Sequence, residues 1–137
     1  MTVPGDVFEI WEDPSGHARF YFSYISPEFT TGTLVLKPDT ELPRHHRELA
    51  FDNLVQVSGT CQLTLTNDAG DIEASYELRP GTAIRLPKGQ WHIHANPYEE
   101  ESVTLFKAEG DATEMVQMMH HKYTKIEPID AATAEQP

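Results

Sequence analysis

The sequence predicts an all-β protein, a sandwich or barrel of short antiparallel strands. Short runs of alternating or β-branched residues recur at intervals of roughly 8–12 residues, a spacing typical of such folds. Ten prolines and eight glycines supply turn residues between these runs. The chain shows no internal repeat, no heptads and no long helical pattern.

The first half of the chain contains several aromatic and apolar runs with strand character. Val7 to Trp11 is apolar except for Glu9, and the aromatic run from Ala18 to Ile25 ends at Ser26-Pro27. A Ser-Gly turn separates two further runs and predicts a hairpin. Strands are therefore expected at residues 7–11, 18–25, 33–36, 42–46, 51–57 and 61–66.

The second half continues the pattern. Asn67 to Gly70 is a turn signal, as is Pro87-Lys88-Gly89, where proline presets φ and glycine permits a positive φ. After the second turn, His92 and His94 alternate with Trp91, Ile93 and Ala95 and should share one face. Strands are expected at residues 72–78, 82–86, 91–95, 102–108 and 115–121.

Length and composition indicate one domain. A chain of 137 residues has room for a single core, which we expect in residues 1–125, followed by a polar tail at residues 126–137 that should fray. No apolar run approaches the ~20 residues that cross a bilayer, and the first residues lack the pattern of a secretory signal. The single cysteine, Cys61, is expected in the core and is compatible with a cytoplasmic location.

The charge balance excludes some partners. The chain carries 22 acidic and 10 basic residues, a formal net charge of −12. Nucleic acids and anionic membrane surfaces both select a basic face, so neither is an expected partner. The charge favours solubility and leaves a small molecule as the expected ligand.

One motif resembles a known family. The residues Gly81-x5-Pro87-x-Gly89-x2-His92-x3-Asn96 match the second signature motif of the cupin family at every specified position. The resemblance implies a double-sheet jelly-roll β-barrel, and it gives His92 the role of a metal ligand.

The family's first motif, G-x5-H-x-H-x3,4-E-x6-G, is matched less closely. Counting back from Gly59 with three residues before the acidic position gives Asp52, Glu48 and His46, with Thr40 in place of the leading glycine. Glu48 then stands where the family has histidine, and Asp52 where it has glutamate. His45 could replace His46 after a shift of one residue.

The resemblance implies a metal site of His46, Glu48, Asp52 and His92. Strand alternation also turns Gln56 and His94 inward, and so polar an interior is costly unless a metal or ligand satisfies it. The set suits iron first, with zinc, manganese or nickel as alternatives. His94 is a reserve ligand or a proton shuttle together with Glu48, and His45 is expected at the rim. The alternative interpretation is a cupin that has lost its metal.

Function is predicted as a class of chemistry. Aromatic residues could wall a pocket, and few basic residues are expected to face inward, which favours an apolar or aromatic substrate. The aromatic candidates are Phe20, Phe22, Tyr24, Trp91, Tyr98 and Phe106. The leading hypothesis is a non-haem iron dioxygenase. The alternatives are a redox-neutral metal-dependent cyclase, isomerase or lyase, and a non-catalytic ligand-binding cupin.

A homodimer is also expected. Cupin barrels commonly pair through an N-terminal strand, and the apolar run at residues 7–11 would be an association hazard as an exposed edge.

Overall fold

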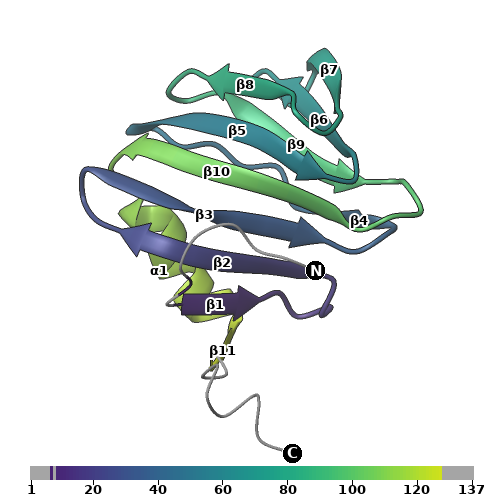
Figure 1. The fold of residues 1–137 in the computed structure, drawn as a ribbon. Coiled ribbons are helices and arrows are strands. Elements are labelled where there is room, and N and C mark those ends of the chain that lie inside the picture. The colour runs from purple at the N-terminus through teal and green to yellow at the C-terminus, as the bar shows by residue number, and fades with distance from the viewer. Residues whose placement is uncertain (1–6, 8, 128–137) are drawn as a thin grey trace, which may run out of the picture.

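The computed structural model describes residue 7 and residues 9–127 (Figure 1). This part of the chain forms strands and one helix, in the order β1 (Glu9–Glu12), β2 (Ala18–Ile25), β3 (Phe29–Leu36), β4 (Thr40–Glu41), β5 (Ala50–Ser58), β6 (Cys61–Thr66), β7 (Ile72–Leu78), β8 (Ala83–Leu86), β9 (Trp91–Asn96), β10 (Ser102–Gly110), α1 (Thr113–Lys122) and β11 (Thr124–Ile126).

The strands form two sheets, and neighbouring strands within each sheet pair in the antiparallel direction. One sheet has the order β11-β1-β2-β3-β10-β5-β8, and the other has the order β4-β9-β6-β7. In Figure 1 the smaller sheet lies at the upper end of the larger one, with β9 behind β5 and β8. The two sheets do not close into a continuous barrel, but the arrangement is the predicted jelly roll.

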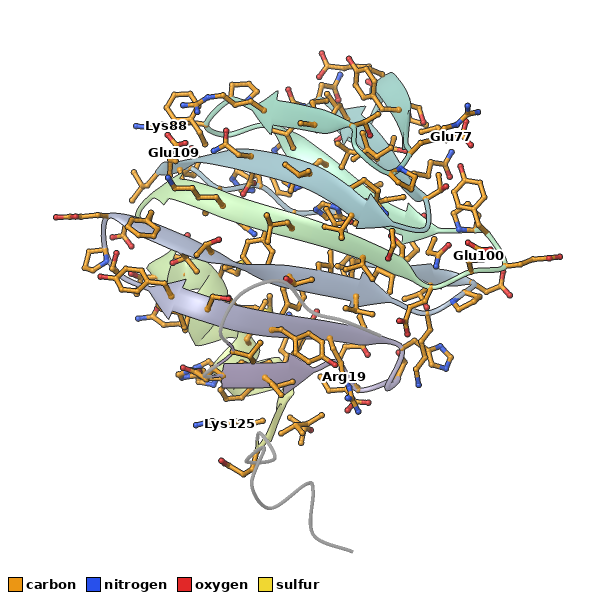
Figure 2. The ribbon with its side chains drawn as sticks, viewed as in Figure 1. Arg19, Glu77, Lys88, Glu100, Glu109 and Lys125 are labelled. Atoms are coloured by element: carbon orange, nitrogen blue, oxygen red, sulfur yellow. The ribbon has the colours of Figure 1, made fainter. Side chains whose placement is uncertain are left out.

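The core lies between the sheets. Phe20, Phe22, Leu54, Leu63 and Phe106 belong to one buried cluster, to which both sheets contribute. Strand β5 buries Asp52, Leu54 and Gln56 in alternation, as the sequence predicted. Cys61 is also buried, as expected. Several charged side chains lie at the periphery, where Glu77 and Glu100 project from the end opposite to Lys88 and Glu109 (Figure 2).

The regular strand expected at residues 42–46 does not form. This segment is irregular, although its backbone makes hydrogen bonds to β9. Only β4, at Thr40–Glu41, is a regular strand here, and an isolated bridge joins His45 to His92. The backbone nitrogen of Leu42 donates to the oxygen of His94 at 2.9 Å, and that of Gly89 donates to the oxygen of Arg47 at 2.8 Å. Residues 42–47 therefore run antiparallel beside β9.

The last predicted strand, at residues 115–121, is wrong, because this segment is the helix α1. Asp111 accepts a hydrogen bond from the backbone nitrogen of Thr113 at 2.9 Å, which satisfies a free donor at the first turn. Met115 and Met119 are four residues apart and face the core. Figure 1 shows α1 behind β2 and β3.

The N-terminal strand is not an edge. β1 pairs with β2 on one side and with β11 on the other, so the edge argument for a homodimer does not apply to it. β11 extends to Ile126, inside the tail that the sequence predicted. Most of that tail, residues 128–137, lies outside the described residues, as does Phe8. No helix among the described residues is long and apolar enough to span a membrane.

Candidate metal centre

Strand β9 carries two of the three histidines that meet in the interior. Its residues alternate in burial, so that His92, His94 and Asn96 are buried while Trp91 and Ile93 are only partly covered. The turn before the strand uses Gly89 at a φ of +78°, a conformation that glycine adopts without steric cost. The buried Asn96 amide donates to the carbonyl oxygens of Leu36 and Glu100, which fixes the end of β9.

The third histidine, His45, lies directly opposite His92. Their backbones exchange two hydrogen bonds, of 3.1 and 2.8 Å. Residues paired in this way project their side chains to the same side of an antiparallel ladder. The ring centroids of His45 and His92 are 4.2 Å apart, and those of His92 and His94 are 5.1 Å apart.

The three imidazoles have the arrangement of a ligand set. Each offers a ring nitrogen, and the three nitrogens lie within 4.8 Å of one another. Nδ1 of His92 lies 2.9 Å from the oxygen of Gln90, and Nδ1 of His45 lies 3.2 Å from that of Pro43. Such carbonyl contacts place the proton on Nδ1 and leave a lone pair on Nε2, as in metal-binding histidines.

Two ring nitrogens have no partner among the described protein atoms. These are Nε2 of His92 and Nδ1 of His94, and both are buried. Burial lowers the pKa of His92 and holds the pKa values of His45 and His94 well below the ordinary value, with further lowering from the neighbouring histidines and Arg47. All three rings are therefore neutral near pH 7, which is the form that binds metals.

His46 and Glu48 are not part of this cluster. The ring of His46 stacks on Trp91 with a centroid distance of 3.8 Å, and its Nε2 lies 2.5 Å from Oε1 of Glu48. The side chain of Glu48 is 66% exposed. Because side chains alternate along an extended segment, His45 and Arg47 face the interior while His46 and Glu48 face outward. The structure thus does not bring together the four ligands expected from the sequence.

Asp52 reaches the interior, as expected, but it forms an ion pair there with the side chain of Arg47. Oδ1 of Asp52 lies 3.0 Å from Nε of Arg47, and the two side chains are only 4% and 8% exposed. Oδ2 of Asp52 lies 3.7 Å from Nε2 of His92, at the border of the histidine cluster. The expectation that few basic residues face inward missed Arg47.

A different count of the first motif would have found this arrangement. The family pattern permits four residues before its acidic position, which gives Asp39-x5-His45-x-Arg47-x4-Asp52-x6-Gly59. Asp39 then stands at the leading glycine, and its φ is +58°, a conformation that favours glycine. In this register Arg47 occupies the position of the family's second histidine, and His94 is the third imidazole of the cluster.

Three cavities lie beside the cluster, and the two larger ones also border α1. A very small cavity between the sheets, of about 10 Å³, is lined by His45, His94 and Asp52, together with Phe20 and Phe106. Two larger cavities, of about 230 and 250 Å³, adjoin His45 and Arg47. Met115 and Met118 line both of the larger ones, and Glu48 lies at the first.

Comparison with known sequences gives a partial match. No family model matches the chain. A segment of 71 residues, 52% of the chain, is 38% identical to the beta-conglycinin beta subunit 1 of Glycine max, and it spans 16% of that subunit's length. A similar match, 36% identical over 69 residues, joins the chain to the alpha' subunit of the same plant, of which it spans 11%.

Solved structures show the fold. KdgF from Halomonas sp. superposes with a TM-score of 0.64 at 16% identity, covering 77% of this chain and 91% of that one. An RmlC-like cupin from Shewanella frigidimarina gives 0.61 at 14%, covering 77% and 86%. An oxalate oxidase in complex with glycolate gives 0.57 at 15%, covering 77% and 50%. The chain therefore has the cupin fold. Its structural likeness includes an oxalate oxidase, and its sequence likeness is to the beta-conglycinin subunits.

Proposed function

We propose that the protein is a metal-dependent enzyme whose divalent ion is held by His45, His92 and His94. The observation that carries the proposal is the buried cluster of three neutral imidazoles, two of which have ring nitrogens without a protein partner. Unpaired buried nitrogens are costly, and a metal ion would satisfy them together.

The residues present fit such an ion. Three nitrogen donors suit iron, zinc, manganese, nickel and cobalt, and the only cysteine, Cys61, is not in the cluster. Such an ion supplies Lewis acidity, and iron(II) adds redox chemistry with dioxygen at the positions that the protein leaves open. The leading reaction is oxygenation of a small organic substrate with an apolar or aromatic body.

The other residues of the site have roles around that chemistry. Met115 and Met118 cover the approach to His45 and limit the entry of water. Glu48, at the mouth of one cavity, is placed to pass a proton between solvent and a bound substrate. A redox-neutral cyclase, isomerase or lyase would use the same site, with the ion polarising a carbonyl oxygen.

The test is metal analysis of protein purified without chelators, followed by titration of the stripped protein with iron(II), manganese(II), nickel(II) and zinc(II). His45→Gln, His92→Gln and His94→Gln should each lose most of the bound metal. His46→Gln and Glu48→Gln are the matched controls, since they alter neighbouring side chains on the opposite face, and both should retain it. Loss of metal in the controls instead would restore the ligand set expected from the sequence.

A metal-free ligand-binding protein is the second candidate. It is favoured by the Arg47–Asp52 pair, because these residues stand at two ligand positions of the family motif and pair with each other. A wild-type protein that binds none of the four metals at stoichiometric amounts, yet retains a small molecule on purification, would establish this function in place of the first.

The expectations for partners, oligomeric state and location stay predictions. The proposed substrate is a small molecule, and the net charge of −12 supports neither nucleic acid nor anionic membrane as a partner. The proposed protein is also a homodimer in the cytoplasm, and its single cysteine is compatible with that location.

A further inference from the structure

Arg47 is a buried cation with unused hydrogen-bond donors. Its side chain is 8% exposed, and neither Nε nor Nη1 has a hydrogen-bond partner among the described residues. Asp52 lies 3.0 Å from Nε, but that nitrogen is not directed at the carboxylate as a hydrogen bond requires. The pair is thus held by charge, and donors of the guanidinium remain free.

Free donors on a buried guanidinium point to an anionic ligand. Arginine keeps its proton in proteins, so the group cannot become neutral to reduce the cost of burial. Its planar fork matches the two oxygens of a carboxylate. Asp52 offsets the charge of Arg47, but it leaves Nη1 unpaired.

The guanidinium borders the space that a ligand would occupy. Arg47 lines the small cavity between the sheets and both larger cavities beside α1. His45 lines the same three cavities, so Arg47 and the histidine cluster border a common region. The cavity of about 250 Å³ has the liquid volume of roughly eight water molecules at ~30 Å³ each. A compound the size of a single substituted ring fits that volume.

The walls of this cavity are mainly apolar. Leu42, Met115, Met118 and Met119 contribute aliphatic and thioether surface, and Phe20 adds an aromatic ring. Methionine adapts to varied apolar shapes. This lining suits the hydrocarbon body of a ligand whose charged end is at Arg47.

The other arginine at this cavity is already occupied. The guanidinium of Arg44 lies over the ring of Trp91 at 4.1 Å, and its Nη1 donates to Thr66 and Asn67 at 3.3 and 3.1 Å. Arg47, whose buried Nε and Nη1 have no hydrogen-bond partner among the described residues, is therefore the better placed of the two arginines to bind a ligand.

We propose that Arg47 binds the carboxylate of the ligand, and that the ligand is a small organic acid with an apolar body. The idea that this ligand is a substrate rests on the function proposed above, whereas its binding does not require a metal. The residue acts as a binding residue, and it holds the charged end of the ligand beside the three histidines.

The test compares isosteric acids and amides on the metal-free protein. Propionate, benzoate and phenylacetate, and the amide of each, are titrated by calorimetry against wild type. We expect the acid to bind more tightly than its amide for at least one pair. Because a lost hydrogen bond to a charged group weakens binding by roughly tenfold to a hundredfold, Arg47→Gln should remove that preference.

Two further variants separate binding from folding. Arg47→Gln/Asp52→Asn removes both charges and avoids an unpaired buried carboxylate, while Arg47→Lys keeps the positive charge and should retain part of the preference. Arg85→Gln is the matched control, because Arg85 lies on β8 in an exposed pair with Glu109 at 3.2 Å. Arg85→Gln changes the net charge by the same amount as Arg47→Gln and should leave the preference for the acid over the amide intact.

Three results would overturn the proposal: equal binding of acid and amide by wild type, an unchanged preference in the folded double variant, or no binding of any acid in the millimolar range. Metal content, measured by mass spectrometry on the same preparations, reports on the proposed function separately. Wild type without metal but with an Arg47-dependent preference would refute the metal site alone. Bound metal without the preference would refute the role of Arg47 alone.

Discussion

Replacing Asp52 by asparagine should destabilise the protein strongly. Asp52 and Arg47 are 4% and 8% exposed, with Oδ1 and Nε 3.0 Å apart. At that separation the attraction is about 5.5 kcal/mol for an effective dielectric constant of ~20. The substitution keeps the size of the side chain but leaves the guanidinium buried without its counter-charge.

The expected loss is at the lower end of the range for such pairs. Removing one partner of a buried ion pair typically costs about 3–5 kcal/mol of unfolding free energy. The Arg47–Asp52 pair lacks a directed hydrogen bond, so we expect about 3 kcal/mol. That is a large share of the roughly 5–15 kcal/mol that stabilises a typical domain.

Urea unfolding of the metal-free protein measures this loss. With a slope of about 1–3 kcal/mol/M, the midpoint should fall by roughly 1–3 M. The double variant Arg47→Met/Asp52→Leu removes both charges and should recover most of the stability. If Asp52→Asn unfolds within about 1 kcal/mol of wild type, the ion pair is not buried as described and the reasoning fails.

Three other predictions test the rest of the structure. Met119→Ala should lose about 2–5 kcal/mol of unfolding free energy because Met119 is fully buried, whereas the part-exposed Met118→Ala should lose much less; equal losses would place α1 differently. Burial raises the pKa of the Cys61 thiol to about 11, so at pH 8 a thiol-modifying reagent should react slowly with folded protein and quickly in urea, and fast reaction of the folded protein would show an exposed thiol. The homodimer predicts a light-scattering mass of twice 15.5 kDa at micromolar concentration, and a mass of 15.5 kDa would refute it.

The second motif determined more of the site than any other stretch. Its glycines, proline and histidine occupy a turn and a strand that contact each other directly, so local spacing was sufficient to place His92 and, through alternation, His94. The strands β5 and β6 and the burial of Cys61 were likewise predicted from local alternation of apolar and polar residues.

The helix α1 was missed for a local reason. Its ten residues contain three methionines and two histidines, and its apolar face is short and irregular, so the segment resembled a strand. Packing of Met115 and Met119 against the core of the sheets selects the helix.

The sequence by itself indicated the jelly-roll fold through the resemblance of its second motif. It also determined the burial of Asp52 and the two inward histidines of β9, since these depend on periodicity within one strand. Tertiary structure decided which face of residues 44–48 meets that strand. His45 and His46 are equally good ligands by type, and a shift of one residue exchanges all the side chains between the two faces. The backbone bonds from His45 to His92 fix that choice. They bring His45 and Arg47 inside and leave His46 and Glu48 outside, because pairing between distant segments sets the register of an extended chain.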